Sequence, residues 1–256
     1  MSPMRLVAVA VFAAVFALLW WPLGQAGYLA AQWPTLGLAG ALALSFALAI
    51  LAAGGIPMRA REMVMLTLLV LYLFHQFEEH GIDLLGERFA FEKDVNALVG
   101  ARFGCAPGSL CPFDPASIFA VNTALVWWTL ALLVLVGTRS LVADLCGVSL
   151  LFVNAWTHVG AAVVTREYNP GLATALGLFL PGSLYAVWAL RQSYAGGLFR
   201  ALTLGLAYGI FLHAALLVTV YLEAVRGLLP MPGLLAVFVA IGTIPALIAA
   251  TAGRRR

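Results

Sequence analysis

The chain has 256 residues, of which 63% are hydrophobic and only 10% are charged. A water-soluble domain of this length carries roughly 25% charged residues, so this composition excludes a soluble globular protein and indicates an integral membrane protein. The net charge of +3 is too small to suggest a nucleic-acid partner.

The expected setting is a bacterial inner membrane. Arginine far outnumbers lysine, and alanine, glycine and leucine are abundant, which is typical of a GC-rich bacterial genome. We therefore expect the lipid bilayer to be a partner of the chain. The composition does not indicate the oligomeric state.

Continuous apolar runs divide nearly the whole chain into candidate membrane spans. A transmembrane helix needs about 20 mostly apolar residues, and eight stretches approach or exceed this length. Turns that contain Gly or Pro separate several of them. The predicted spans are residues 5–22, 35–54, 62–80, 117–137, 141–165, 172–190, 199–224 and 232–251. We therefore expect an all-α polytopic bundle in which residues 1–256 form a single membrane domain, with no soluble domain.

The first span, residues 5–22, has two interpretations. Arg5 followed by an apolar run is compatible with a signal peptide that is cleaved from the mature protein. The run continues into Trp20 and Trp21, however, and a Trp pair suits an anchor at the membrane interface. We expect a retained helix, and a cleaved leader is the alternative.

The positions of Lys and Arg predict the orientation of the bundle. When the connections are assigned to alternate sides, the side that holds both termini carries more Lys and Arg than the other side. By the positive-inside rule, both termini then face the cytoplasm and the 81–116 loop lies outside.

The third span, residues 62–80, ends in a cluster of titratable side chains. At about 100° per residue, His75, Glu78 and Glu79 share one face of a helix. Carboxylates in or near the hydrocarbon layer are costly and usually functional, so the trio predicts a site. The alternative is a salt-bridged helix end that faces the outer loop.

The loop that follows carries two of the three cysteines. Cys105 and Cys111 flank a five-residue stretch with Pro and Gly, which can bring two thiols within bridging reach. An oxidising compartment outside the membrane would keep the bond. We predict a Cys105–Cys111 disulfide, with two unpaired thiols as the alternative, and we expect Cys146 to be buried filler.

The fifth and seventh spans run outward like the third, and they bring further polar groups to the same depth. His158 and His213 lie on these spans, and Asn154 precedes His158 by one helical turn on the same stripe. The outer turn after the fifth span adds Arg166, Tyr168 and Asn169. Polar groups from three helices thus indicate a shared pocket.

Several of these residues have alternative structural roles. His213 could hydrogen-bond a neighbouring helix, and Arg166 could be either an interfacial cation or the partner that neutralises the carboxylates. His80 points away from His75 and Glu223 lies near a helix end, so both also fit solvation at the interface.

Three motifs occur in the order and spacing of a known family. They are His75-x-x-Glu78-Glu79, His158 and Tyr168-x-Pro170-Gly171. Together they resemble the HXXEE family of integral membrane proteins over roughly residues 62–182. The three motifs in combination are fairly specific, whereas the five-residue motif alone would not be. The resemblance implies a shared enzymatic site without naming a reaction.

Imidazole and carboxylate ligands suit a divalent metal, namely Zn²⁺, Fe²⁺ or Mn²⁺. The predicted ligands are His75, Glu78, Glu79, His158 and His213. Two His and one or two Glu with an open position make a reasonable catalytic zinc site, in which one glutamate ligates and its neighbour takes a proton from metal-bound water. The predicted catalytic residues are Glu78, Glu79, Arg166 and Tyr168, and the predicted substrate-binding residues are Asn154 and Asn169.

The expected function is that of a metal-dependent hydrolase acting on a lipid or another amphiphilic small molecule. The H-x-x-E-H and H-E-x-x-H patterns of metalloproteases are absent, and four histidines are too few for the boxes of membrane desaturases. A metal-dependent membrane oxidase or hydroxylase is the first alternative, and a metal-free intramembrane glutamate endopeptidase is a minor one. From another class, a proton- or ion-coupled transporter could use the His/Glu cluster as a relay.

Overall fold

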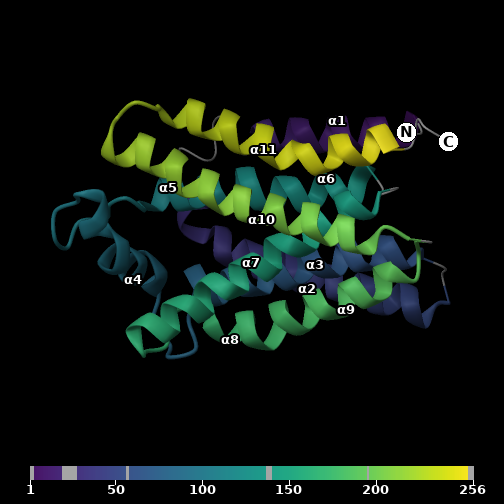
Figure 1. Cartoon of the computed structure of the whole chain (residues 1–256), viewed down its shortest axis with the longest axis horizontal. Coiled ribbons are helices and arrows are strands. Elements are labelled where there is room, and N and C mark those ends of the chain that lie inside the picture. The colour runs from purple at the N-terminus through teal and green to yellow at the C-terminus, as the bar shows by residue number, and fades with distance from the viewer. Residues whose placement is uncertain (1–2, 19–27, 56–57, 137–139, 195, 253–256) are drawn as a thin grey trace.

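The computed structural model describes residues 3–18, 28–55, 58–136, 140–194 and 196–252, and these residues form an all-α bundle (Figure 1). The α-helices are α1 (Pro3–Leu18), α2 (Tyr28–Ala53), α3 (Ala60–His80), α4 (Ala90–Val99), α5 (Pro115–Ala120), α6 (Trp128–Val136), α7 (Leu141–Thr165), α8 (Leu172–Thr174), α9 (Leu180–Arg191), α10 (Leu198–Val220) and α11 (Met231–Ala252). The 3₁₀ helix η3 (Gly100–Phe103) follows α4, and the π-helical segments are η4 (Val121–Trp127), η5 (Ala175–Phe179) and η6 (Tyr221–Val225).

Seven helical segments of the described chain are long and apolar enough to cross a membrane. They are Ala31–Ala53, Ala60–His80, Pro115–Val136, Leu141–Thr165, Leu172–Arg191, Leu198–Val225 and Met231–Ala252. These segments confirm the polytopic fold and correspond to the second to eighth predicted spans. The first predicted span overlaps α1, but its last residues lie outside the described part of the chain, so an eighth span stays a prediction.

The helices run up and down through the bundle (Figure 1). α1 starts and α11 finishes at one end, while α4 and its flanking loops lie at the opposite end. α3, α7 and α10 all run toward the α4 end, and the α8–α9 segment starts there. The polar residues near the carboxyl ends of three different helices are thereby brought to one end of the bundle. Which side of the membrane that end faces stays a prediction.

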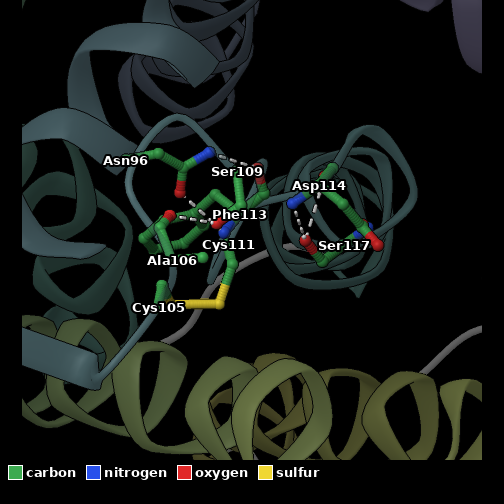
Figure 2. The surroundings of a disulfide bond; sticks show 8 residues. All are labelled: Asn96, Cys105, Ala106, Ser109, Cys111, Phe113, Asp114 and Ser117. Atoms are coloured by element: carbon green, nitrogen blue, oxygen red, sulfur yellow. Dashed lines mark hydrogen bonds between the residues drawn. A yellow bond between two sulfur atoms is a disulfide. The ribbon is translucent and has the colours of Figure 1, made fainter. Parts of the chain in front are cut away.

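The segment between α3 and α5 forms a small cap over this end. It contains α4, η3 and the Cys105–Cys111 disulfide that the spacing predicts (Figure 2). The side chain of Asn96 on α4 donates to the Phe113 carbonyl (2.7 Å) and accepts from the Phe113 N–H (2.9 Å). These two bonds tie α4 to the start of α5, so the cap is anchored to the membrane helices at both of its ends.

Near the opposite end of the bundle, a partly buried polar contact joins three elements. The Tyr194 hydroxyl, in the α9–α10 connection, donates to Asp144 Oδ2 on α7 (2.7 Å) and accepts from Arg61 on α3 (2.8 Å). Burial raises the pKa of Tyr194 above its usual value, and the neighbouring Asp144 carboxylate raises it further. The neutral phenol is therefore the form that joins the ends of these helices.

Candidate metal centre

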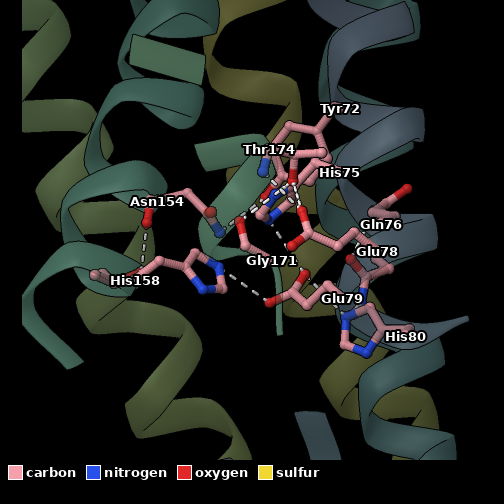
Figure 3. Close-up of polar contacts among 12 residues, drawn as sticks. Tyr72, His75, Gln76, Glu78, Glu79, His80, Asn154, His158, Gly171 and Thr174 are labelled. Carbon is pink, nitrogen blue, oxygen red and sulfur yellow. Dashed lines mark hydrogen bonds and ion pairs between the residues drawn. The ribbon is translucent and has the colours of Figure 1, made fainter. Parts of the chain in front are cut away.

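The three titratable groups that converge most closely are His75 and Glu79 of α3 and His158 of α7 (Figure 3). All three side chains are buried, and one ligand atom from each lies within 4.8 Å of the others. His75 Nε2 is 3.5 Å from Glu79 Oε2, and His158 Nε2 is 3.4 Å from Glu79 Oε1. The i, i+4 spacing places His75 and Glu79 on one face of α3, and that face is turned toward α7.

The protonation of His158 follows from its partner Asn169. The Asn169 amide Nδ2 donates to the backbone carbonyl of His158 (3.0 Å), so its Oδ1 is left as an acceptor. His158 Nδ1 lies 2.7 Å from that oxygen and therefore carries a proton. In the neutral ring, Nε2 is then a bare lone pair, and it faces Glu79.

The hydrogen-bond partners of His75 also determine which of its ring nitrogens carries the proton. Thr174 Oγ1 donates its one proton to Glu78 Oε2, so it can only accept from His75 Nδ1 at 2.8 Å. His75 Nε2 is therefore the unprotonated nitrogen of a neutral ring. It is fully buried and has no hydrogen-bond partner among the described residues.

Two imidazole lone pairs and a carboxylate that face one another repel unless a cation joins them. That cation is a metal ion or a proton, and the proton can sit on one of these rings or on the neighbouring His80, whose Nε2 is 3.1 Å from Glu79 Oε2, since an uncompensated buried charge costs several kcal/mol. One ligand atom from each of the three residues lies within 4.8 Å of the others, which is near enough for a single ion to contact all three after small movements of the side chains. A second partner on each Nδ1 is also how metal-binding histidines are usually oriented. The donor set fits a divalent metal.

Glu78, which the sequence places beside Glu79 as a ligand, is turned toward a different helix. Its Oε1 accepts from the Tyr168 hydroxyl (2.8 Å) and the Ala173 N–H (3.1 Å). Its Oε2 accepts from the Thr174 N–H (2.7 Å) and from the Thr174 hydroxyl. The carboxylate thus satisfies free N–H groups at the start of the α8–α9 span, where negative charge also stabilises the helix dipole. Glu78 is not part of the three-residue cluster.

Gly171 explains how the two imidazoles can approach each other so closely. It has φ +91° and caps the start of α8 directly beside the cluster. A Cβ at this position would lie 2.7 Å from Cε1 of His158 and 2.9 Å from Cε1 of His75. Only glycine fits both the backbone conformation and the space.

A second polar network surrounds His80, which follows Glu79 in α3. The side chain of His80 is buried, with Nε2 3.1 Å from Glu79 Oε2 and Nδ1 3.6 Å from Glu92 Oε1 of α4. Gln76 donates to Asn122 Oδ1 (2.6 Å), and Asn122 Nδ2 lies 3.1 Å from His80 Nε2. His80 is therefore part of the buried structure around the cluster, where the sequence left interfacial solvation equally open.

Tyr168 and Arg166 lie at the outer turn after α7. The Tyr168 hydroxyl bridges Glu78 and the Leu84 N–H (3.1 Å), and burial raises its pKa. Arg166 is exposed and ends α7 with φ 60°. Its guanidinium is not among the partners that the described structure gives to Glu78 or Glu79, so it does not supply the cation there.

Asn154 and His213 lie on the wall of an adjoining cavity. Asn154 Nδ2 is 3.3 Å from the Tyr72 hydroxyl, and its Oδ1 is buried without a hydrogen-bond partner among the described residues. His213 Nδ1 donates to the Gly209 carbonyl one turn earlier in the same helix (2.8 Å). His213 is thus near the cluster but is not one of its three members.

The cluster opens into a cavity of ≈ 580 Å³ between α3, α4, η4, α7 and α10. Glu79, His80, His158 and His213 form part of its wall, and most of the remaining wall is apolar. Small-molecule sites typically occupy roughly 300–1,000 Å³ with a few polar groups on an apolar wall. The cavity thus has the size and lining of a small-molecule site, with its titratable side chains at one side.

The sequence alone did not identify four residues that shape this site: Gln76, Glu92, Asn122 and Thr174. Gln76 lies on the same helix as His75 and Glu79, and an amide in an apolar span was a usable signal. Glu92 lies on α4, in the loop between two spans, where a charged residue is expected and gives no signal. Asn122 is a lone amide in an apolar span, which is the same signal. Thr174 had none, because threonine is common in membrane helices.

An all-α bundle that buries a His–His–Glu cluster beside a cavity defines this chain as a polytopic membrane protein with an intramembrane polar site. Residues 66–189 match the family described as "Protein of unknown function with HXXEE motif". The match confirms the resemblance seen in the motifs, and it covers the segment that supplies His75, Glu79 and His158. No curated protein and no solved structure matches the chain.

Proposed function

We propose that this protein is a metal-dependent membrane enzyme that hydrolyses a lipid or another amphiphilic substrate. The observation that carries the proposal is the convergence of the Nε2 atoms of His75 and His158 on the buried Glu79 carboxylate, with both Nδ1 atoms held by other partners. Three protein ligands with an open position are the usual form of a catalytic zinc site. The apolar cavity beside them suits a substrate with a hydrocarbon portion.

His75, Glu79 and His158 would hold the metal, which would supply an activated water and polarise the substrate. Glu78 accepts four hydrogen bonds and serves to hold the α8–α9 span in place. The proton acceptor is then a different group. His213 is our candidate, because its Nδ1–H is donated to the Gly209 carbonyl and its Nε2 is free to accept a proton at the cavity wall.

Oxidation is the second candidate function. Two histidines and one carboxylate are also the ligand set of non-haem Fe(II) oxygenases, which keep open positions for oxygen and substrate. The two candidates share the residues and differ in the metal, so the identity of the bound metal separates them. A proton- or ion-coupled transporter is the alternative in which a proton, not a metal, joins the three groups.

We also propose that the protein lies in a bacterial inner membrane with both termini in the cytoplasm, which puts the cluster in the outer half of the bilayer. The excess of Lys and Arg on the side of the termini supports this orientation.

Metal analysis of protein purified in detergent tests the proposed function. Wild type should carry one metal per chain, and H75A, E79Q and H158A should each lose it. H213A is the matched control, because it removes a histidine from the same cavity without touching the three ligands, and it should keep the metal. Wild type without metal, or H75A with full metal, would refute a metal enzyme and favour the transporter.

A further inference from the structure

α7 and α10 pack backbone to backbone where Gly205 and Gly209 of α10 meet α7. A Cβ at Gly205 would lie 2.9 Å from the carbonyl of Leu145, and one at Gly209 would lie 2.9 Å from the carbonyl of Ser149. Glycines four residues apart allow this close contact between membrane helices. From that crossing toward the α4 end the two helices diverge (Figure 1).

The cavity occupies the space between the diverging halves and reaches the surface there. Thr157 and Ala161 of α7 and Leu217 of α10 all line it, and Thr157 and Leu217 are also exposed. Ala161 and Thr157 lie about 6 and 12 Å from the end of α7 at Thr165, since a helix rises about 1.5 Å per residue. This part of the opening is therefore at the depth of the membrane spans. The cavity also reaches the surface at the α4 end, where the exposed residues Asp94 and Glu167 line it.

The surface around this opening is apolar. The exposed side chains nearest to it in sequence are Trp156, Val163 and Val164 on α7 and Ile210, Phe211 and Val218 on α10. Val163 and Val164 of α7 each have 72% of their surface exposed, and together with the other apolar side chains they form a surface of the kind that contacts lipid in a membrane protein. A ligand that enters between these helices must come from the bilayer.

The charges of the cavity wall restrict the head of that ligand. At the α4 end the wall contains the carboxylates of Asp94 and Glu167, and the described residues of the wall include no Lys or Arg. The remaining carboxylate, Glu79, lies deeper among the imidazoles and is the proposed metal ligand. Burial raises the pKa of Asp94, Lys93 lowers it, and the nearby carboxylates Glu87, Asp83 and Glu167 raise it further. An anionic head would meet like charges, so an uncharged or cationic head fits.

We propose that the cavity binds a membrane lipid with a single hydrocarbon chain and an uncharged or cationic head, which enters from the bilayer between the outer halves of α7 and α10. The cavity volume of ≈ 580 Å³ suits one ligand of small-molecule size. This lipid would be the substrate of the proposed enzyme, and its role as a substrate rests on the proposed function. The binding itself requires no metal.

Photolabelling in phosphatidylcholine nanodiscs tests the proposal. The probe is hexadecylamine with a diazirine near its terminal methyl, and unlabelled hexadecanol is the competitor. Labelled peptides should come from the cavity wall, chiefly residues 212–217, and hexadecanol should suppress them. Hexadecanoic acid with the same diazirine should label these peptides about tenfold less, because its carboxylate faces the carboxylates of the wall.

Narrowing the opening should block entry. A161F places a ring at the mouth and should lower labelling of residues 212–217 about tenfold, the change expected when about two methylene groups lose their buried contacts. V163F adds the same ring on the lipid-facing side of α7, away from the cavity wall, and should label like wild type. L216W narrows the opening from α10 and replaces A161F if that variant does not fold.

Three outcomes would overturn the inference. They are equal labelling in A161F, L216W and V163F, equal labelling by the amine and the acid, and a dimer that covers the α7–α10 face and excludes the probe. Metal content is measured on the same preparations with and without chelator. Labelled protein without metal would refute the proposed enzyme and leave lipid binding intact, whereas metal without labelling would do the reverse.

Discussion

Replacing Gly171 by alanine should dismantle the His75–Glu79–His158 cluster while the bundle stays folded. The new methyl carbon would lie 2.7 Å from Cε1 of His158 and 2.9 Å from Cε1 of His75. Because non-bonded carbons settle about 3.5–4.0 Å apart, the rings must retreat by roughly half an ångström or more. Metal sites tolerate only about 0.2 Å in their bond lengths, so G171A should lose most of its metal affinity.

Two other glycines separate the steric effect from backbone strain. Gly86 has φ +86° and open space around its Cβ position, so G86A carries about 1–2 kcal/mol of strain without any contact with the cluster. Gly177 also has open space, with no positive φ, so G177A carries neither effect. Cobalt(II) titration followed by visible absorption gives the metal affinity, and thermal unfolding in detergent gives the Tm.

We expect G86A to lower the Tm by roughly 2–8 °C and keep its cobalt affinity, and G177A to change neither. G171A should lower both. Equal cobalt affinity in G171A and G86A would show that the close approach of Gly171 does not position the imidazoles, and would refute the reasoning.

Four further predictions follow from the same geometry and from the spans. T174V removes the hydroxyl that orients one imidazole and should weaken metal binding about 10–100-fold, while T174S should restore it. E78A leaves buried N–H groups at the start of the α8–α9 span and should lower the Tm by roughly 4–12 °C, a loss that E78Q recovers only in part. Thiol labelling of unfolded, unreduced protein should find Cys146 alone, and three reactive thiols would refute the disulfide. Reporter fusions after Arg59 and Arg102 should show the inside and the outside, and the reverse pattern would overturn the orientation.

The fold was the part most accessible from sequence. Hydrocarbon thickness fixes the length of a span, so hydropathy alone located the seven described membrane helices to within a few residues at most of their ends. Sequence gave no sign of the π-helical segments, because a single extra residue in a turn leaves hydropathy unchanged. It also could not show that α7 and α10 diverge, since that depends on where Gly205 and Gly209 meet the partner helix.

Only part of the candidate site could be predicted from the sequence. Helical periodicity placed His75 and Glu79 on one face, and the alternation of spans brought His158 to the same depth. Periodicity says nothing about which neighbour each face meets. It therefore could not distinguish the partners of adjacent glutamates, nor show that His213 bonds to its own helix. Those assignments require the positions of the neighbouring helices.

The separate positions of Glu78 and Glu79 give a physical reason for the spacing of the family motifs. Adjacent helical residues differ by about 100°, so two neighbouring carboxylates can face two different helices. Glu79 faces α7 and its His158, while Glu78 holds Tyr168 and the start of α8. By fixing that start, Glu78 fixes the turn that presses Gly171 against both imidazoles. The second glutamate of the motif thus completes the cluster, and the first holds the turn that gives the cluster its shape.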